Sequence, residues 1–189
     1  MKTAIIVHGW TGEKEYFNPT KPALSNAHWF PWIQKQLLIN GILAQTPEMP
    51  DAYEPNYEKW KWMFEQFKID EGTALVGHSC GGGFLVRWLS ENKIKVGKVV
   101  LVAPWLDPKH EIDKDFFKFD IDSDLSSKTK GLTVMYSTDD YSDILKSVAI
   151  LKSKLKEAKF QEFIGKGHFV FKSMKSEEFP ELLKEVLEK

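Results

Sequence analysis

Residues 77–81 read GHSCG, a pattern that suits a serine acting as a nucleophile. They lie between an apolar run that ends at Val76 and a helical pattern that begins near Gly82. Acyl transfer needs a serine hydroxyl held clear of the sheet, and a sharp strand-to-helix turn achieves this only where neighbouring residues are small. The same letters also fit an ordinary glycine-rich turn that happens to contain Ser79, so the pattern needs support from other residues.

Two adjacent acids and a histidine follow this serine along the chain. Asp139 and Asp140 come directly after the fifth apolar run, and His168 comes after the sixth. A serine is a good nucleophile only when a base accepts its proton and a carboxylate holds that base in the right tautomer. His168 could instead be an ordinary surface histidine, but the glycines beside it favour a shaped loop. Either acid could be its partner or could cap the following helix.

Acyl transfer also places negative charge on a carbonyl oxygen, which two backbone N–H groups can stabilise. We expect one from Cys80, directly after the serine, and the other from Trp10 in the segment HGWTG at 8–12. Trp10 could also be a packed aromatic, which does not exclude the backbone role. The thiol of Cys80 is not the expected nucleophile, because this turn exposes its central residue and the next residue begins the helix.

Composition limits the partners and cofactors of the chain. Lys and Arg number 26 and Asp and Glu number 27, so no net charge favours nucleic acid or an anionic membrane. No apolar run is long enough to span a bilayer, and a single cysteine fits a reducing, cytoplasmic location. The other histidines lack metal-ligand spacing and no nucleotide-binding loop occurs, so we expect no metal or cofactor and a small-molecule substrate. Monomer and dimer both stay open.

Helical patterns separate six short apolar runs, at 3–7, 42–45, 73–76, 96–102, 132–136 and 159–164. Most runs are continuous rather than alternating, as in strands of a parallel sheet that is covered on both faces. The alternation of strands and helices predicts a single α/β domain over residues 1–189.

Five helices are predicted. Pro31, which suits a first helical turn, and Gly41, which suits a C-terminal cap, place a helix of about one to three turns between them. Apolar residues at helical spacing predict the others, at 60–67, 84–89, 144–155 and 179–187. Asp143 is expected to cap the fourth of them. The aromatic stripe of the second is expected to be core. Residues 106–130 form one long irregular connection, and connections of that length are usually functional or disordered. We therefore regard this segment as a candidate lid.

Together these motifs resemble the small serine hydrolases similar to retinoblastoma-binding protein nine and its bacterial relatives. The resemblance rests on HGW at 8–10, GHSCGG at 77–82, LVAPW at 101–105, STDD at 137–140 and GHF at 167–169. It implies a reduced α/β-hydrolase fold with helices on both faces of a six-stranded, mostly parallel sheet of order 2-1-3-4-5-6 and a site at the switch between strands one and three. It also implies that Asp140, the second acid of STDD, completes a triad with Ser79 and His168.

The expected function is hydrolysis of a carboxylic ester, thioester or amide through an acyl-enzyme. Trp10, Trp105, Phe116 and Phe117 could form an apolar acyl pocket, although each could equally be core. The alternative function is a non-catalytic protein-binding module that keeps the hydrolase fold. An intact triad favours the enzyme, because a scaffold has no physical reason to retain all three groups.

Overall fold

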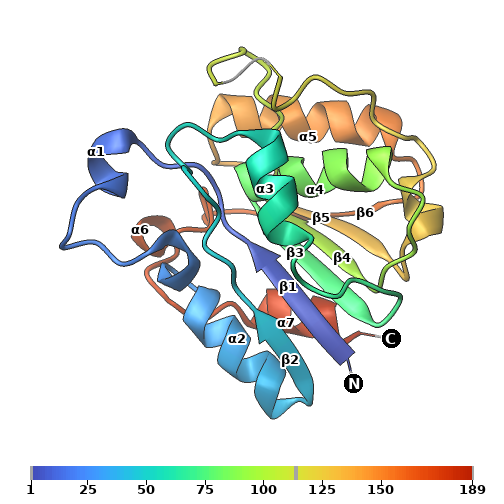
Figure 1. Ribbon diagram of the computed structural model, residues 1–189, viewed down its shortest axis with the longest axis horizontal. Helices are drawn as coiled ribbons and strands as arrows, with labels where there is room; N and C mark the ends of the chain where they lie inside the picture. Colours follow the sequence, from blue (N-terminus) through green and yellow to red (C-terminus); the bar gives the residue numbers. More distant parts are fainter. Residues whose placement is uncertain (1, 113–114, 189) are drawn as a thin grey trace.

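A computed structural model describes residues 2–112 and 115–188 of the chain (Figure 1). Six strands form one sheet in the order β2-β1-β3-β4-β5-β6, and every neighbouring pair is parallel. The strands are β1 (Lys2–Val7), β2 (Ile42–Gln45), β3 (Thr73–His78), β4 (Val99–Val102), β5 (Leu132–Ser137) and β6 (Lys159–Phe163). The predicted fold class and strand order are therefore confirmed.

Burial along the strands explains why their sequences are continuous apolar runs. Both β4 and β5 are buried at every position, whereas the edge strand β6 is partly exposed throughout. Strands in the middle of a parallel sheet contact helices on both faces, so side chains of either parity must be apolar. The predicted fourth run began too early, because Val96 forms only an isolated bridge to Thr129 before the regular ladder starts at Val99.

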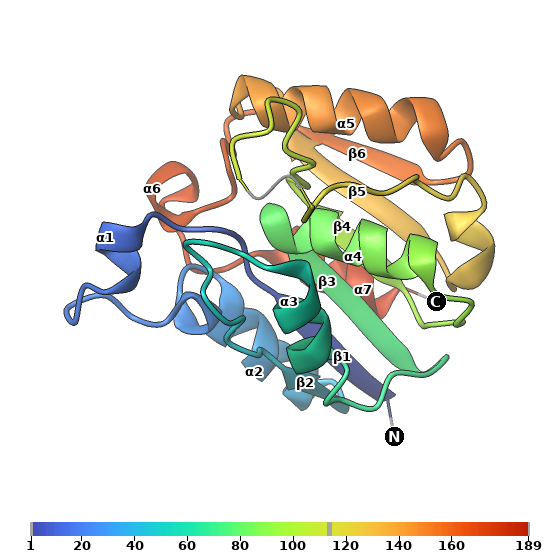
Figure 2. The same ribbon diagram turned by 45° about the horizontal axis from the view of Figure 1, so that its top comes forward.

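Helices cover both faces of the sheet (Figures 1 and 2). The helices are α1 (Glu13–Tyr16), α2 (Phe30–Ile39), α3 (Tyr57–Phe64), α4 (Cys80–Glu91), α5 (Ser142–Lys154), α6 (Phe171–Met174) and α7 (Pro180–Leu187), with 3₁₀ turns at Leu24–Asn26 and Leu125–Lys128. The pair α2 and α7 lies on one face, and α3, α4 and α5 lie on the other. The two helices absent from the prediction, α1 and α6, have four residues each and bury none of them, so they leave no apolar period.

The aromatic stripe of α3 packs in the core, as the sequence predicts. Trp60 and Phe64 are fully buried. The Phe64 ring lies 5.0 Å from the Trp88 ring of α4, and the Trp60 ring lies 5.2 Å from that of Phe116. The first contact joins α3 to α4, the helix that follows the serine turn, and the second joins α3 to the segment 106–130.

The prediction that Asp143 caps α5 is wrong. The N-cap position of this helix is Tyr141, and no side chain caps it. Asp143 is already inside the helix, where its carboxylate lies 2.7 Å from the Lys109 ammonium and 3.7 Å from that of Lys146. The cation of Lys109, which is distant in sequence, gives this acid a partner that local spacing does not reveal.

The segment 106–130 packs against α4 over its described residues. The Arg87 guanidinium of α4 donates to the carbonyl of Phe116 at 2.9 Å, and the Lys128 ammonium donates to the carbonyl of Leu89 at 2.9 Å. The Phe116 ring is fully buried. Residues 113–114 of this candidate lid lie outside the described residues, and its role as a lid stays a prediction.

Candidate active site

Ser79 occupies a sharp turn between β3 and α4, in a backbone conformation that side chains rarely adopt. Its φ is +55° and its ψ is −121°, and such strain persists only where the surroundings impose it. A Cβ added to Gly77 would lie 2.6 Å from the carbonyl oxygen of Gly81. A Cβ added to Gly81 would in turn collide with the carbonyls of Val7 and His8. The glycines of the motif therefore allow the close backbone packing that keeps Ser79 in this turn conformation.

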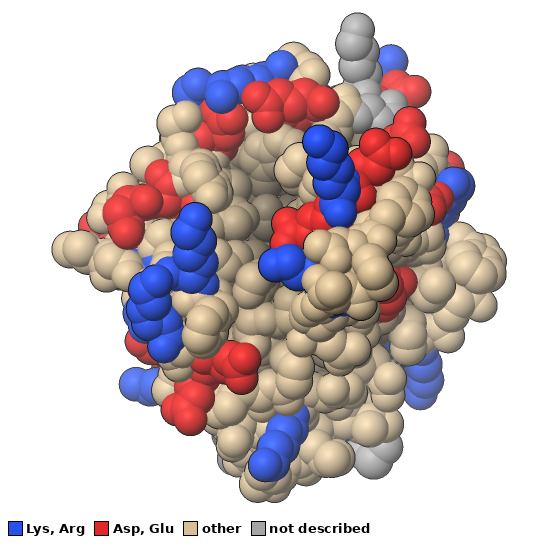
Figure 3. Space-filling model, turned by 90° about the vertical axis from the view of Figure 1, so that its left-hand side faces the viewer, with Lys and Arg blue, Asp and Glu red and all other residues tan. Residues whose placement is uncertain are grey.

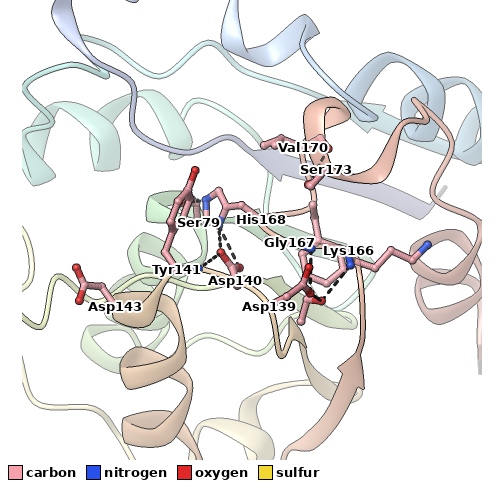
Figure 4. Close-up of polar contacts among 12 residues, drawn as sticks. Ser79, Asp139, Asp140, Tyr141, Asp143, Lys166, Gly167, His168, Val170 and Ser173 are labelled. Atoms are coloured by element: carbon pink, nitrogen blue, oxygen red, sulfur yellow. Dashed lines mark hydrogen bonds and ion pairs between the residues drawn. The ribbon is translucent and has the colours of Figure 1, made fainter.

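The structure brings Ser79, His168 and Asp140 together in one line (Figure 4). The distance from Ser79 Oγ to His168 Nε2 is 3.0 Å, and His168 Nδ1 lies 2.9 Å and 3.1 Å from the two oxygens of Asp140. An ionised carboxylate only accepts hydrogen bonds, so Nδ1 carries a proton, and in the neutral ring Nε2 then accepts from the hydroxyl. The side chain of Asp140 is fully buried. This neutral tautomer is the one in which the ring can take a proton from the serine.

The neighbouring acid, Asp139, has a different set of partners. Its Oδ1 accepts from the Ser137 hydroxyl at 2.5 Å, from Gly165 N at 3.0 Å and from Gly167 N at 3.3 Å. The Ser137 hydroxyl bond and the backbone donors lower the pKa of Asp139, although partial burial opposes them. This carboxylate holds the backbone of the loop that carries His168. The sequence shows two adjacent acids but does not show this division of their contacts.

The loop after β1 passes directly over the serine. A Cβ added to Gly9 would lie 2.9 Å from Ser79 Cβ and 3.4 Å from its Oγ. Buried His8 fixes this loop, because its Nδ1 donates to the Gly9 carbonyl at 2.8 Å and its Nε2 accepts from Met49 N at 2.8 Å. Burial lowers the pKa of His8 despite the nearby Glu48, which keeps the ring neutral for both bonds.

The backbone N–H groups of Trp10 and Cys80 have no hydrogen-bond acceptor among residues 2–112 and 115–188. The N–H group of Trp10 belongs to the loop that crosses the serine. The N–H group of Cys80 begins α4, and the first N–H groups of a helix lack intrahelical partners. The Trp10 side chain is 47% exposed, and its indole donates to the Tyr53 carbonyl at 3.0 Å. Neither N–H group is thus used by another described residue, and their role in an oxyanion hole stays a prediction.

Residues 4–186 match the family described as Serine hydrolase. This chain belongs to that family. YdeN of Bacillus subtilis (strain 168), which carries a provisional hydrolase name, is 32% identical over 106 residues. That alignment covers 54% of this chain and 50% of YdeN, so the matched region spans about half the length of this relative.

Solved structures agree with the serine hydrolase family at the level of the fold. The ydeN gene product from Bacillus subtilis superposes with a TM-score of 0.81 at 25% identity, over 97% of this chain and 96% of that one. Est1E from Butyrivibrio proteoclasticus superposes with a TM-score of 0.60 at 17% identity, over 88% of this chain and 79% of that one. The second similarity concerns the α/β-hydrolase fold alone.

The thiol of this serine hydrolase is inaccessible. Cys80 is fully buried at the first position of α4, and burial, with a smaller contribution from Asp107, raises the pKa of its thiol well above the usual value. The thiolate is the reactive form of cysteine. Ser79, one residue earlier, is therefore the group that this turn presents.

Three of the four aromatic residues expected in an acyl pocket pack against one another. Phe116 is fully buried in the core, and Trp105 is only 9% exposed. Phe117 packs edge-on against both, at ring distances of 4.9 Å from Phe116 and 5.7 Å from Trp105. Trp105 adjoins the serine turn, because its backbone N–H donates to the Ser79 carbonyl at 3.0 Å. Trp10 belongs to the loop over Ser79, and the acyl pocket stays a prediction.

Two cavities adjoin the loops that carry the site. One, of about 340 Å³, is lined by residues on both sides of the His168 ring, including Tyr141 and Val170. The other is about 570 Å³ and borders Thr11 of the loop over the serine and Phe171 at the start of α6. Its remaining lining is Glu15, Tyr16, Lys21, Pro22, Ala23, Leu24, Asn26, Ala27, His28, Glu48 and Glu177. Figure 3, which faces the side with α1 and α6, shows this surface hollowed, with acidic and basic residues around it.

Within residues 2–112 and 115–188, no group of three His, Cys, Asp or Glu side chains could hold a metal ion. Over the same residues of the hydrolase, every helix is too short or too polar to cross a membrane.

Proposed function

We propose that this serine hydrolase cleaves carboxylic esters, thioesters or amides of small molecules through an acyl-enzyme on Ser79. The observation that carries the proposal is the line of hydrogen bonds from the Ser79 hydroxyl through His168 to Asp140, at 3.0 Å and 2.9 Å. A hydroxyl, a neutral imidazole and a buried carboxylate in this order are the groups that acyl transfer needs.

In the proposed mechanism, Ser79 Oγ attacks the carbonyl carbon of the substrate while its proton passes to His168 Nε2. Asp140 stabilises the imidazolium that forms. The backbone N–H groups of Trp10 and Cys80 donate to the negative carbonyl oxygen. The leaving group then takes the proton from Nε2, and a water molecule repeats the sequence on the acyl-enzyme, with His168 again as the base. Each step uses only side chains, backbone donors and water.

We propose that the cavity of about 570 Å³ binds one part of the substrate. Its volume falls within the range of small-molecule sites. Its lining combines apolar side chains such as Leu24 and Phe171 with polar and charged ones, including Glu15, Glu48 and Glu177. Thr11 connects it to the loop over the serine, and Phe171 connects it to the loop of His168. Trp10, which is exposed beside the serine, is the one aromatic residue of the predicted pocket that we retain.

The proposal also keeps the finer resemblance to the retinoblastoma-binding protein nine-like hydrolases. The motifs HGW, GHSCGG, STDD and GHF all fall at or just beyond the carboxyl ends of β1, β3, β5 and β6. In that family the second acid of STDD completes the triad, which agrees with the bond from Asp140 to His168 Nδ1.

Labelling with a fluorophosphonate probe tests this function. We expect the wild-type protein to be labelled at Ser79 and to hydrolyse at least one compound in a panel of p-nitrophenyl esters and amides. The Ser79→Ala variant should lose both labelling and turnover. Ser153→Ala is the matched control, because this serine is exposed on α5, away from the strand ends. Absence of labelling in folded wild-type protein, or labelling that survives Ser79→Ala, would contradict the proposal.

A further inference from the structure

The loop that carries His168 is held by its carbonyl groups as well as by its N–H groups. The Nε2 atom of His78 lies 2.8 Å from the carbonyl oxygen of His168. The indole N–H of Trp29 donates to the carbonyl oxygen of Phe169, the next residue, at 2.9 Å. Two consecutive carbonyls of the loop are therefore fixed by side chains from β3 and from the residue before α2.

The protonation state of His78 follows from its partner. A carbonyl oxygen cannot donate a hydrogen bond, so the Nε2 atom of His78 must carry a proton. The ring is only 5% exposed, and it lies 5.8 Å from the Trp29 ring and 5.0 Å from the His168 ring. Burial, together with the nearby His168, lowers the pKa of His78 well below the usual value. The ring is thus neutral and present as one tautomer, a fixed donor.

The position of His78 in the chain makes this donor more than a packing contact. His78 directly precedes Ser79 in the chain, and its ring is hydrogen-bonded to the loop that carries His168. The same residue thus contacts both the proposed nucleophile and the loop of the proposed base. The loop itself needs support, because Phe169 has a φ of +54°, a conformation that costs energy for a residue with a side chain. A shift of the His168 carbonyl would move the ring and change the 3.0 Å distance from Nε2 to Ser79 Oγ.

We propose that His78 is a positioning residue, whose ring donates to the His168 carbonyl and so sets the distance between the base and the nucleophile. Trp29 assists by fixing the next carbonyl. The inference rests on the proposed function of Ser79 and His168, and it adds a second histidine that never touches the substrate.

Two substitutions separate the donor from the packing of the ring. His78→Phe keeps an aromatic ring against Trp29 and removes the N–H group. His78→Gln removes the ring and keeps an N–H donor at about the reach of Nε2. If the donor positions the base, His78→Phe should lower kcat by about tenfold to a hundredfold with KM within about twofold, since small misplacements of catalytic groups are costly. His78→Gln should stay within about threefold of wild type, and the rate of fluorophosphonate labelling should follow the same order.

Wild-type rates for the Phe variant would overturn the proposal, and so would equal losses in both variants, because ring packing would then be the cause. Absence of labelling in the wild type would instead contradict the proposed function itself. If His78→Phe does not fold, the wild-type protein still gives an answer. Nitrogen-15 NMR of its histidines should show His78 as the neutral Nε2–H tautomer between pH 5.5 and 8. An Nδ1–H tautomer or a charged ring in that range would overturn the inference.

Discussion

At the scale of single residues, the contrast between Asp139 and Asp140 gives a direct test of the site. Asp140→Asn should lower kcat by about 10³-fold to 10⁴-fold, because an amide can donate to Nδ1 and so stabilise the tautomer that cannot accept the serine proton. The measurement is steady-state hydrolysis of the best ester in the panel, with circular dichroism as a check of folding.

Asp139→Asn is the matched control for that change. This variant makes the same change in the neighbouring acid. The groups that donate to the Asp139 carboxylate belong to Ser137 and to the backbone of the loop that carries His168, and none belongs to the His168 ring. We expect a smaller loss of kcat, about tenfold or less, together with a lower melting temperature. A larger loss of kcat in Asp139→Asn than in Asp140→Asn would exchange the roles of the two acids.

The buried thiol makes a second prediction at this scale. Native protein should resist iodoacetamide at pH 8 and keep the hydrolytic activity proposed above, because burial of Cys80 raises the pKa of its thiol and blocks access. The same protein in urea should take up one carboxamidomethyl group, since the chain has one cysteine. Mass spectrometry measures both. Rapid modification in the native state would show that the start of α4 opens.

Some residue assignments could be read from the sequence and others could not. Ser79 stands out because glycines surround it, and His168 because it follows a strand in a glycine-flanked loop. The partner of Asp143 could not be read, because Lys109 reaches it from a distant loop. His78 carries no local signal either, since its bond spans 90 residues of the chain.

At the scale of elements, the turn from β3 to α4 depends on how closely it approaches β1. Gly81→Ala should lower the free energy of unfolding by about 2 kcal/mol or more, because the added methyl group meets the rigid carbonyls of Val7 and His8. Gly12→Ala is the control, since a Cβ there has no neighbour within 4 Å and its φ is −75°. Its effect should stay within about 0.5 kcal/mol.

Urea unfolding followed by tryptophan fluorescence measures both variants. Equal stability of Gly81→Ala and wild type would mean that β1 can move away from α4, against the packing described above.

The long elements were predictable because each buries a periodic or continuous apolar face. Strand β2 matches its predicted range of 42–45, and α5 lies within one to two residues of its predicted limits. The four-residue helices α1 and α6 were not predictable, because tertiary contacts and not their own sequences stabilise them. The cavity of about 570 Å³ was not predictable for a related reason, since part of its lining comes from these two short helices.

At the scale of the whole molecule, buried neutral histidines couple folding to pH. The pKa values of His8 and His78 are lowered in the folded state, so the unfolded chain binds their protons first. The free energy of unfolding should therefore fall as the pH drops below about 6.5, the pKa of unfolded histidine, by up to about 1.4 kcal/mol per pH unit for each proton.

Urea unfolding at pH 7.5 and pH 5.5 tests this coupling, with His78→Gln as the comparison. Between these values the wild type should lose about 1 kcal/mol more than the variant, which lacks the His78 ring. Parallel pH profiles for the two proteins would show that the His78 ring is charged in the folded state or reaches solvent.

The separation of Ser79 and His168 by 89 positions has a consequence for synthesis on the ribosome. At about 5–20 residues per second, the base leaves the ribosome roughly 4–18 seconds after the nucleophile. The β3–α4 turn can fold in that interval, but Ser79 then lacks its proposed base. We therefore expect the proposed hydrolysis to begin only late in translation, when β6 and the loop after it add to the edge of the sheet.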